Sequence, residues 1–170
     1  EKPEVIFENI LKTLKEKRIY TFVSYPNVDP GNYDIRKVIE KYSQDKNFMF
    51  YKNLDRDMFL SIYKQSDFIL GNSSSGVCEA ASIAIPALNI GTRQTGRYAE
   101  ENVIFTDSTL NAIKEGIDKV SNSKFQISVE NMKNPYGDGS SASQAYEIIK
   151  NKNFKSMLLK TEDALEIKNG

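Results

Sequence analysis

The chain has 170 residues, of which 39% are hydrophobic and 27% are charged, so it can bury the core of one compact domain. Its 23 basic and 23 acidic residues give a formal net charge of zero, which disfavours nucleic-acid binding through a broad basic surface. No apolar run approaches the roughly 20 residues of a membrane helix, and the N-terminal residues do not resemble a signal peptide. We therefore expect a cytoplasmic protein without a membrane or nucleic-acid partner.

Helical and strand patterns alternate along the chain. Helices are indicated by apolar residues at helical spacing, as in Ile6, Ile10 and Leu14, and strands by β-branched and aromatic runs. We expect helices at 3–17, around 35–42, at 55–65, directly after the turn at 71–76, and at 110–120, 124–132 and 140–150. We expect strands at 19–25, 47–51, 67–70, 86–90 and 103–106. Asp55 should cap the third helix, with Met58, Phe59, Ile62 and Tyr63 facing inward.

Alternating strands and helices predict an α/β fold, a Rossmann-like parallel sheet with helices on both faces. Such sheets bind ligands at the carboxyl ends of their strands, so the loops that follow the strands should converge at one edge. The chain opens with a helix, whereas a doubly wound domain opens with a strand, so we expect the first strand to be absent from this chain. We expect one domain over residues 1–150 and a polar tail over 151–170.

The chain has a single cysteine, Cys78, and no histidine. One cysteine excludes an internal disulfide and fits a reducing compartment. Without histidine, no serine or cysteine can be activated by an imidazole base, and the commonest zinc ligand is missing. We expect Cys78 to be a small buried thiol, and we expect neither a metal nor a cofactor.

The segment from Gly71 to Arg97 carries the strongest functional signal. An apolar strand runs into the turn GNSSSG, and a helix with Glu79 in its first turns follows. Backbone N–H groups at the start of a helix lack internal partners and bind anions, and the serines add hydroxyl donors. Arg93 and Arg97 add positive charge, and a carboxylate can accept from a sugar diol. The segment predicts a site for a nucleotide diphosphate.

Four sequence blocks carry a family resemblance: YPNVDPG at 25–31, GNSSSGVCE at 71–79, NIGTRQTGR at 89–97 and NPYGDG at 134–139. Over residues 1–150 the chain resembles the C-terminal half of UDP-N-acetylglucosamine 2-epimerases, in the hydrolysing branch that supplies sialic-acid-type sugars. The non-hydrolysing branch is less similar, because other residues replace TRQTGR there. The resemblance implies two Rossmann-like halves facing across a cleft, the glycosyltransferase-B arrangement, with UDP held mainly by the half present here.

The resemblance assigns the serines and the glutamate of the turn to UDP. Ser73 and Ser74 match phosphate-contacting serines, although a serine at a helix start can simply be an N-cap. Glu79 matches a ribose-binding glutamate. Its alternative role in a capping box is disfavoured, because Gly76 stands where the box needs serine or threonine.

Other candidate contacts lie in neighbouring loops. Arg93 matches an arginine near the diphosphate, and Arg97 either contacts phosphate or pairs with Glu100 or Glu101. Asn27 matches a nucleotide-contacting asparagine, and Leu54 follows the strand where the family contacts uracil through backbone. The turn at 134–139 is expected to be structural, with Asp138 or Ser140 as the cap of the next helix.

The resemblance implies an enzyme that converts UDP-N-acetylglucosamine and water to N-acetylmannosamine and UDP, without a cofactor. Its catalytic carboxylates belong to the N-terminal half and its histidine to the loop just before residue 1, so this chain alone is expected to be inactive. The expected partners are the UDP-sugar and the missing N-terminal domain, with homo-oligomer formation left open. A diacetamido-trideoxy sugar substrate, a glycosyltransferase of the same architecture and a non-catalytic nucleotide-sugar sensor remain alternatives.

Overall fold

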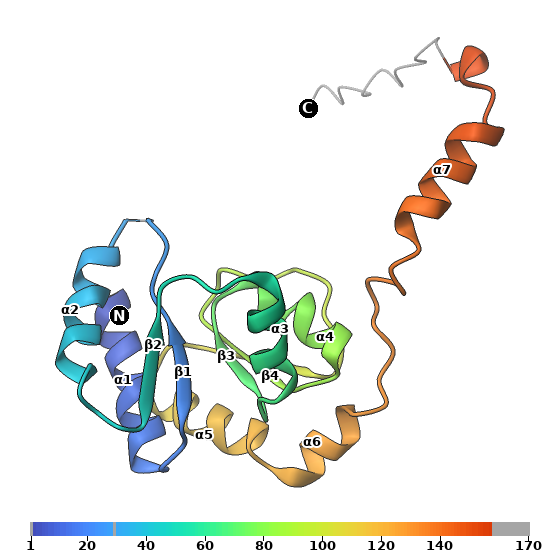
Figure 1. Ribbon diagram of the computed structural model, residues 1–170. Helices are drawn as coiled ribbons and strands as arrows, with labels where there is room; N and C mark the ends of the chain where they lie inside the picture. The colour runs from blue at the N-terminus through green and yellow to red at the C-terminus, as the bar shows by residue number, and fades with distance from the viewer. Residues whose placement is uncertain (1, 29, 158–170) are drawn as a thin grey trace, which may run out of the picture. The chain divides into compact units, whose positions relative to one another are not determined.

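The computed structural model describes residues 2–28 and 30–157 (Figure 1). They belong to two compact units, Glu1–Tyr136 and Gly137–Gly170. The first unit contains the helices α1 (Pro3–Glu16), α2 (Asn32–Tyr42), α3 (Arg56–Lys64), α4 (Glu79–Ile83), α5 (Leu110–Val120) and α6 (Ser123–Val129). Its strands are β1 (Thr21–Ser24), β2 (Phe48–Tyr51), β3 (Ile69–Gly71), β4 (Ala87–Ile90) and β5 (Val103–Thr106). The second unit contains α7 (Ser141–Asn151) and the 3₁₀ turn η2 (Phe154–Met157).

Every strand pairing in the described residues is parallel, as the alternation of elements predicts. The strands form two sheets instead of the one we expected, a pair with order β1-β2 and a triplet with order β3-β4-β5. Within the described ranges, β1 and β3 each pair along one edge only. In Figure 1, β1 lies on the side of its pair that is toward β3.

Helices α1, α2 and α5 cover one face of both sheets. α1 packs against α2 and against α5, and α5 packs against β4 and β5. A single buried cluster therefore joins the two sheets through these helices; it includes Ile10, Leu11, Leu14, Val23, Val38, Phe48, Leu88, Ile90, Ile113, Ile117 and Val120. Burial of this apolar surface is the main force that keeps the sheets together.

Helices α3 and α4 lie on the opposite face, in front of β3 and β4 in Figure 1. Tyr63 of α3, Ala80 of α4 and Ala87 of β4 form a smaller buried cluster there. Asp55 caps α3 as expected, because its carboxylate accepts a hydrogen bond from the Met58 N–H at 2.9 Å. Met58 itself is 50% exposed, so the expectation that it faces inward is wrong.

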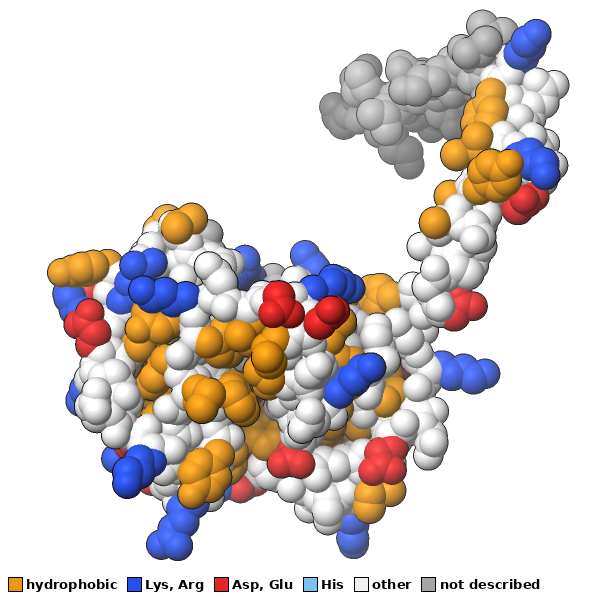
Figure 2. All heavy atoms as spheres, viewed as in Figure 1, with side chains coloured by type: hydrophobic (Ala, Val, Ile, Leu, Met, Phe, Trp, Pro, Cys, Tyr) orange, Lys and Arg blue, Asp and Glu red, His pale blue; other side chains and the backbone are white. Residues whose placement is uncertain are grey.

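The β1–β2 pair keeps apolar side chains exposed on the face away from α1 and α2. Val23 is buried, and the alternation of a strand turns its neighbour Phe22 to the other face, beside Met49 in the register. Phe22 is 49% exposed and Met49 is 62% exposed. Figure 2 shows hydrophobic side chains gathered over this part of the first unit.

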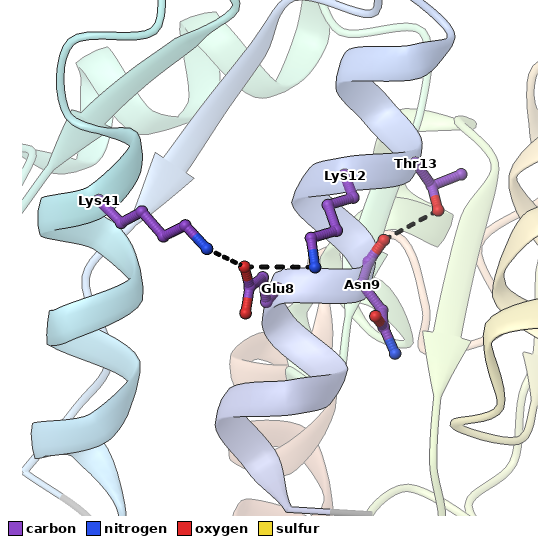
Figure 3. Close-up of polar contacts among 5 residues, drawn as sticks. All are labelled: Glu8, Asn9, Lys12, Thr13 and Lys41. Atoms are coloured by element: carbon purple, nitrogen blue, oxygen red, sulfur yellow. Dashed lines mark hydrogen bonds and ion pairs between the residues drawn. The ribbon is translucent and has the colours of Figure 1, made fainter.

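An ion pair between Glu8 and Lys41 joins α1 to α2 at the surface (Figure 3). Glu8 of α1 accepts from Lys41 of α2 at 2.6 Å and pairs with Lys12 one turn along α1 at 3.4 Å. The hydrogen bond from Lys41 lowers the pKa of Glu8. Thr13, which is buried, donates its hydroxyl to the Asn9 carbonyl within α1 at 2.8 Å. The ion pairs add little stability, because exposed ion pairs are weak, so the packing of α1 against α2 rests mainly on their buried apolar side chains.

The C-terminal part differs in detail from the expectation. Asp138 accepts from the Ser140 N–H at 2.9 Å, whereas Ser140 occupies the N-cap position of α7 without a side-chain capping bond. No residue of α7 is buried, and the helix exposes Tyr146, Ile148 and Ile149. The expected tail at 151–170 contains the last residue of α7 and then η2, and its residues 158–170 lie outside the described part. The domain boundary at 150 stays a prediction.

The close packing of α5 on β4 gives a first testable prediction. A Cβ added at Gly116 would lie 2.6 Å from Cδ1 of Leu88, which is buried on all sides and has little room to move. We expect Gly116→Val to lower the free energy of unfolding by about 2 kcal/mol, because overpacking forces the backbone apart. Urea unfolding measures the change. Glu115→Val, at an exposed position of the same helix, is the control, and equal effects would contradict the packing argument.

Candidate nucleotide-binding site

The strands bring the predicted site loops to one edge of the first unit. The register of β1 and β2 pairs Ser24 with Tyr51, so the loops carrying Asn27 and Leu54 start side by side. The register of β3 and β4 pairs Gly71 with Asn89, so the serine turn and the loop carrying Arg93 also start side by side. Figure 1 shows these strands running in one direction, with their carboxyl ends at the top. The convergence expected for a parallel α/β sheet is therefore present.

The serine turn is a 3₁₀ turn, η1 (Ser74–Gly76), and not the start of the α-helix that the sequence predicts. Ser73 caps this turn, because its hydroxyl oxygen accepts from the Ser75 N–H at 3.2 Å. The capping role considered for Ser73 is thus real, and it leaves the hydroxyl proton free to donate. The Ser73 and Ser74 N–H groups have no hydrogen-bond partner among the described residues. Two backbone donors therefore remain available to an anion at this turn.

The α-helix after the turn is short. α4 has five residues and begins at Glu79, with Cys78 in its N-cap position. The helix dipole consequently contributes less than the sequence suggests, and the donors of η1 carry more of the anion-binding capacity. Cys78 is only partly buried, so the expectation of a fully buried thiol is wrong.

Two hydrogen bonds connect Tyr63 of α3 to the serine turn. Its hydroxyl donates to the Ser75 carbonyl at 3.0 Å and accepts from the Ser75 hydroxyl at 3.2 Å. Tyr63 is 5% exposed, and burial raises the pKa of its hydroxyl. The proton therefore stays on Tyr63 at neutral pH, and the turn is held by a donor that does not ionise. Periodicity places Tyr63 on the buried face of α3, but no sequence signal connects its hydroxyl to Ser75.

The charged candidates are exposed and unengaged. Glu79 and Arg93 are exposed, and neither forms an ion pair within the part of the chain that the structure describes. Arg97 is also exposed and does not pair with Glu100, which instead accepts from the Tyr98 hydroxyl at 2.5 Å. Exposed carboxylate and guanidinium groups can reorient toward a ligand without first breaking an internal interaction.

The two earlier loops contribute different surfaces. Asn27 is exposed beyond β1, and its amide can donate and accept. Leu54 is half-buried just before the cap of α3, which suits contact through backbone atoms. Nothing in the structure places a ligand, so contacts of Asn27, Leu54, Ser73, Ser74, Glu79 and Arg93 with UDP stay predictions.

Gln94 is a site residue that the sequence argument missed. It is 3% exposed, although its neighbours Arg93 and Thr95 are exposed. Its side-chain Nε2 donates to the Asn72 carbonyl at 3.0 Å, which connects the arginine loop, residues 91–98, to the serine turn. The only sequence signal was its position inside the block NIGTRQTGR, which did not distinguish it from its exposed neighbours.

The block at 134–139 reaches the same region. Asn134 donates to the Ser82 hydroxyl of α4 at 2.7 Å, and the Tyr136 hydroxyl donates to the Tyr98 carbonyl. Partial burial raises the pKa of Tyr136, and the neighbouring thiol of Cys78 acts in the same direction. Asn134 and Tyr136 therefore connect α4 to the end of the arginine loop, in line with the structural role expected for this block.

Within residues 2–28 and 30–157, no three or more Asp, Glu, Cys or His side chains form a group that could hold a metal ion. In the same ranges, no helix combines the length and the apolar character needed to cross a bilayer. The site is thus described by backbone N–H groups, hydroxyls, one carboxylate and one arginine at the carboxyl edge of the strands.

The fold and this edge define the class as a Rossmann-like α/β domain of parallel strands with helices on both faces. The chain belongs to the UDP-N-acetylglucosamine 2-epimerase family, which matches residues 1–150. The expected fold class and family are both confirmed.

Individual relatives support the family. The chain is 33% identical over 156 residues to the UDP-N,N'-diacetylbacillosamine 2-epimerase (hydrolyzing) of Legionella pneumophila, covering 92% of this chain and 40% of that protein. It is 37% identical over 83 residues to the UDP-N-acetylglucosamine 2-epimerase of Neisseria meningitidis, covering 49% of this chain and 22% of that protein. The S. aureus MnaA-UDP co-structure has a TM-score of 0.68 at 22% identity, covering 91% of this chain and 42% of that one. The chain thus spans about 40% of the length of the first relative.

The Tyr63 anchor gives a prediction with a defined pH dependence. At pH 7, Tyr63→Phe leaves the Ser75 carbonyl without its donor and should cost about 1–2 kcal/mol of unfolding free energy. Above pH ~10, the unfolded tyrosine ionises while folded Tyr63, whose pKa is raised, keeps its proton, so wild-type stability falls. The phenylalanine variant lacks this loss, so the difference in unfolding free energy between the two proteins should become smaller as the pH rises.

Chemical unfolding at pH 7 and at several values above 10 measures this gap. Tyr146→Phe, at an exposed position of α7, is the control and should show no pH-dependent difference of this kind. A gap for Tyr63→Phe that stays constant across the alkaline range would contradict a raised pKa at Tyr63.

Proposed function

We propose that this chain is the UDP-binding half of a hydrolysing UDP-N-acetylglucosamine 2-epimerase. The proposal rests on one observation. The Ser73 and Ser74 N–H groups, Arg93 and Glu79 lie at the same sheet edge, and no hydrogen bond or ion pair within the described residues occupies these donors or the carboxylate. Anion donors beside a free carboxylate suit a diphosphate joined to a ribose diol. Family membership supports this choice over other nucleotide ligands.

In the proposed reaction, the other half of the enzyme supplies the base that removes the proton at sugar C2. The bond between C1 and the UDP oxygen then breaks, and the electron pair leaves with UDP to give an unsaturated sugar. Water adds from the opposite face and yields N-acetylmannosamine. The residues of this half bind the diphosphate, and their donors stabilise the negative charge that grows on it as the bond breaks. Ser73, Ser74 and Arg93 are assigned to the phosphates and Glu79 to the ribose.

The unpaired sheet edges support the proposal that the chain is one half of a longer enzyme. A right-handed connection through α1 would place a preceding parallel strand next to β1. The free edges of β1 and β3 offer that strand two partners. We assign this position to the first strand of the domain, which would close the two sheets into one.

A second sugar is a specific alternative for the same site. The Legionella pneumophila relative is named for a diacetylated bacillosamine substrate, which is a diacetamido-trideoxy sugar. The residues assigned here contact the UDP part, which both substrates share. The choice between the two sugars therefore belongs to the other half of the enzyme.

Nucleotide binding can be tested on the 170-residue chain by calorimetry with UDP. We expect Glu79→Ala and Ser74→Ala each to weaken binding by about 1–3 kcal/mol, because each leaves polar ligand atoms without a partner. Glu115→Ala, on the exposed side of α5, is the matched control for loss of one carboxylate. Unchanged affinity in both site variants would remove the assignment.

Catalysis requires the full-length protein. With UDP-N-acetylglucosamine it should release N-acetylmannosamine and UDP, whereas the 170-residue chain should release neither, because the catalytic carboxylates are assigned to the other half. Chromatographic product analysis measures both. Parallel reactions with the diacetamido-trideoxy substrate identify the preferred sugar, and release of UDP only in the presence of an acceptor would indicate a glycosyltransferase instead.

A further inference from the structure

Gln94 stands out because it is buried inside an otherwise exposed loop. It is 3% exposed between Arg93 and Thr95, which are both exposed. Burying an amide without hydrogen bonds is costly, so a buried glutamine is expected to have partners for its polar atoms. Nε2 meets this requirement through the Asn72 carbonyl at 3.0 Å.

Among the residues that the structure describes, this hydrogen bond is the one direct polar connection between the two loops. β3 and β4 are in register up to Gly71 and Asn89, and beyond these residues the chain leaves the sheet on both sides. In the described ranges, no other hydrogen bond joins residues 72–78 to residues 91–98. The loop has its own internal turns, from Thr95 N–H to the Thr92 carbonyl at 3.0 Å and from Arg97 N–H to the Gln94 carbonyl at 3.2 Å. Its position relative to the serine turn therefore depends on the Gln94 side chain.

The other end of the same amide has no partner. Gln94 Oε1 is buried and accepts no hydrogen bond among the described residues. An unpaired buried acceptor costs free energy, so this glutamine is a poor choice if stability alone is required. An apolar side chain of similar length would fill the space without that cost, but it could not hold the Asn72 carbonyl.

We propose that Gln94 is a positioning residue that holds the backbone at Arg93 and the free N–H groups of the serine turn in one geometry, so that both can act on the same diphosphate. The inference rests on the proposed function and adds a residue that does not itself touch the ligand. Its hydrogen bond to Asn72 fixes the loop backbone from which Arg93 extends relative to the two backbone donors of the serine turn. Preorganised donors of this kind bind an anion more tightly than donors that must be ordered on binding.

The test compares UDP with uridine in the full-length protein and in Gln94→Met, which keeps the side-chain length and removes the donor. UDP affinity should fall about tenfold, the effect of losing one well-placed polar interaction. Uridine affinity should stay unchanged, because uridine has no diphosphate. The thermal midpoint should also stay near that of wild type, because the variant removes an unpaired buried oxygen and leaves the Asn72 carbonyl to solvent. Gln65→Met, an exposed glutamine at the end of α3, is the control.

A double-mutant cycle with Arg93→Ala tests whether the loss of UDP affinity in Gln94→Met depends on Arg93. If Gln94 acts by placing Arg93, the double variant should bind UDP about as weakly as Arg93→Ala alone, since coupled residues are not additive. Additive losses, equal losses for UDP and uridine, or a large drop in the thermal midpoint would each overturn the positioning role. Loss of UDP binding in wild type itself would instead overturn the proposed function, and the inference with it.

Discussion

The parallel register between β3 and β4 controls the geometry of the candidate site. β4 is buried throughout and pairs with β3 on one edge and β5 on the other, so its position admits little variation. Leu88 lies under Gly116 of α5, which fixes the depth of the strand against the helix layer. The serine turn and the arginine loop start from adjacent points on these strands. The hydrogen-bond ladder between β3 and β4 therefore sets the distance between the starts of the two loops. Ligands of open parallel sheets bind outside the carboxyl ends of the strands, which is where these two loops begin.

Much of this arrangement could be predicted from the sequence. Period-two and helical patterns place every strand and helix near its observed position, and Asp55 was identifiable as a cap by its residue type and position. These features depend on contacts between residues close in the chain, which a sequence displays directly. The candidate loops were also predictable, because the topology of a parallel sheet sends each of them to the same edge.

The remaining features depend on contacts between residues distant in sequence. The burial of Gln94 requires the Asn72 carbonyl, which lies 22 residues earlier, and no local pattern marks that pairing. The serine turn takes a 3₁₀ form and is held by Tyr63 of α3, whose hydroxyl donates to the Ser75 carbonyl. The exposure of Met58 depends on whether another element packs over it, and the division into two sheets depends on which strand edges pair. Sequence periodicity describes which face of an element is apolar, but it does not describe what covers that face.

The open edges of β1 and β3 have a consequence for the chain in isolation. Each leaves backbone N–H and carbonyl groups of a parallel ladder without a strand partner in the described residues. Free ladder groups are a template for any extended segment, including one from another copy, and proteins usually shield them with lysine, proline or a bulge. Neither β1 nor β3 contains a lysine or a proline that would provide such protection. Lateral self-association of this chain at high concentration is therefore the behaviour that these free edges favour.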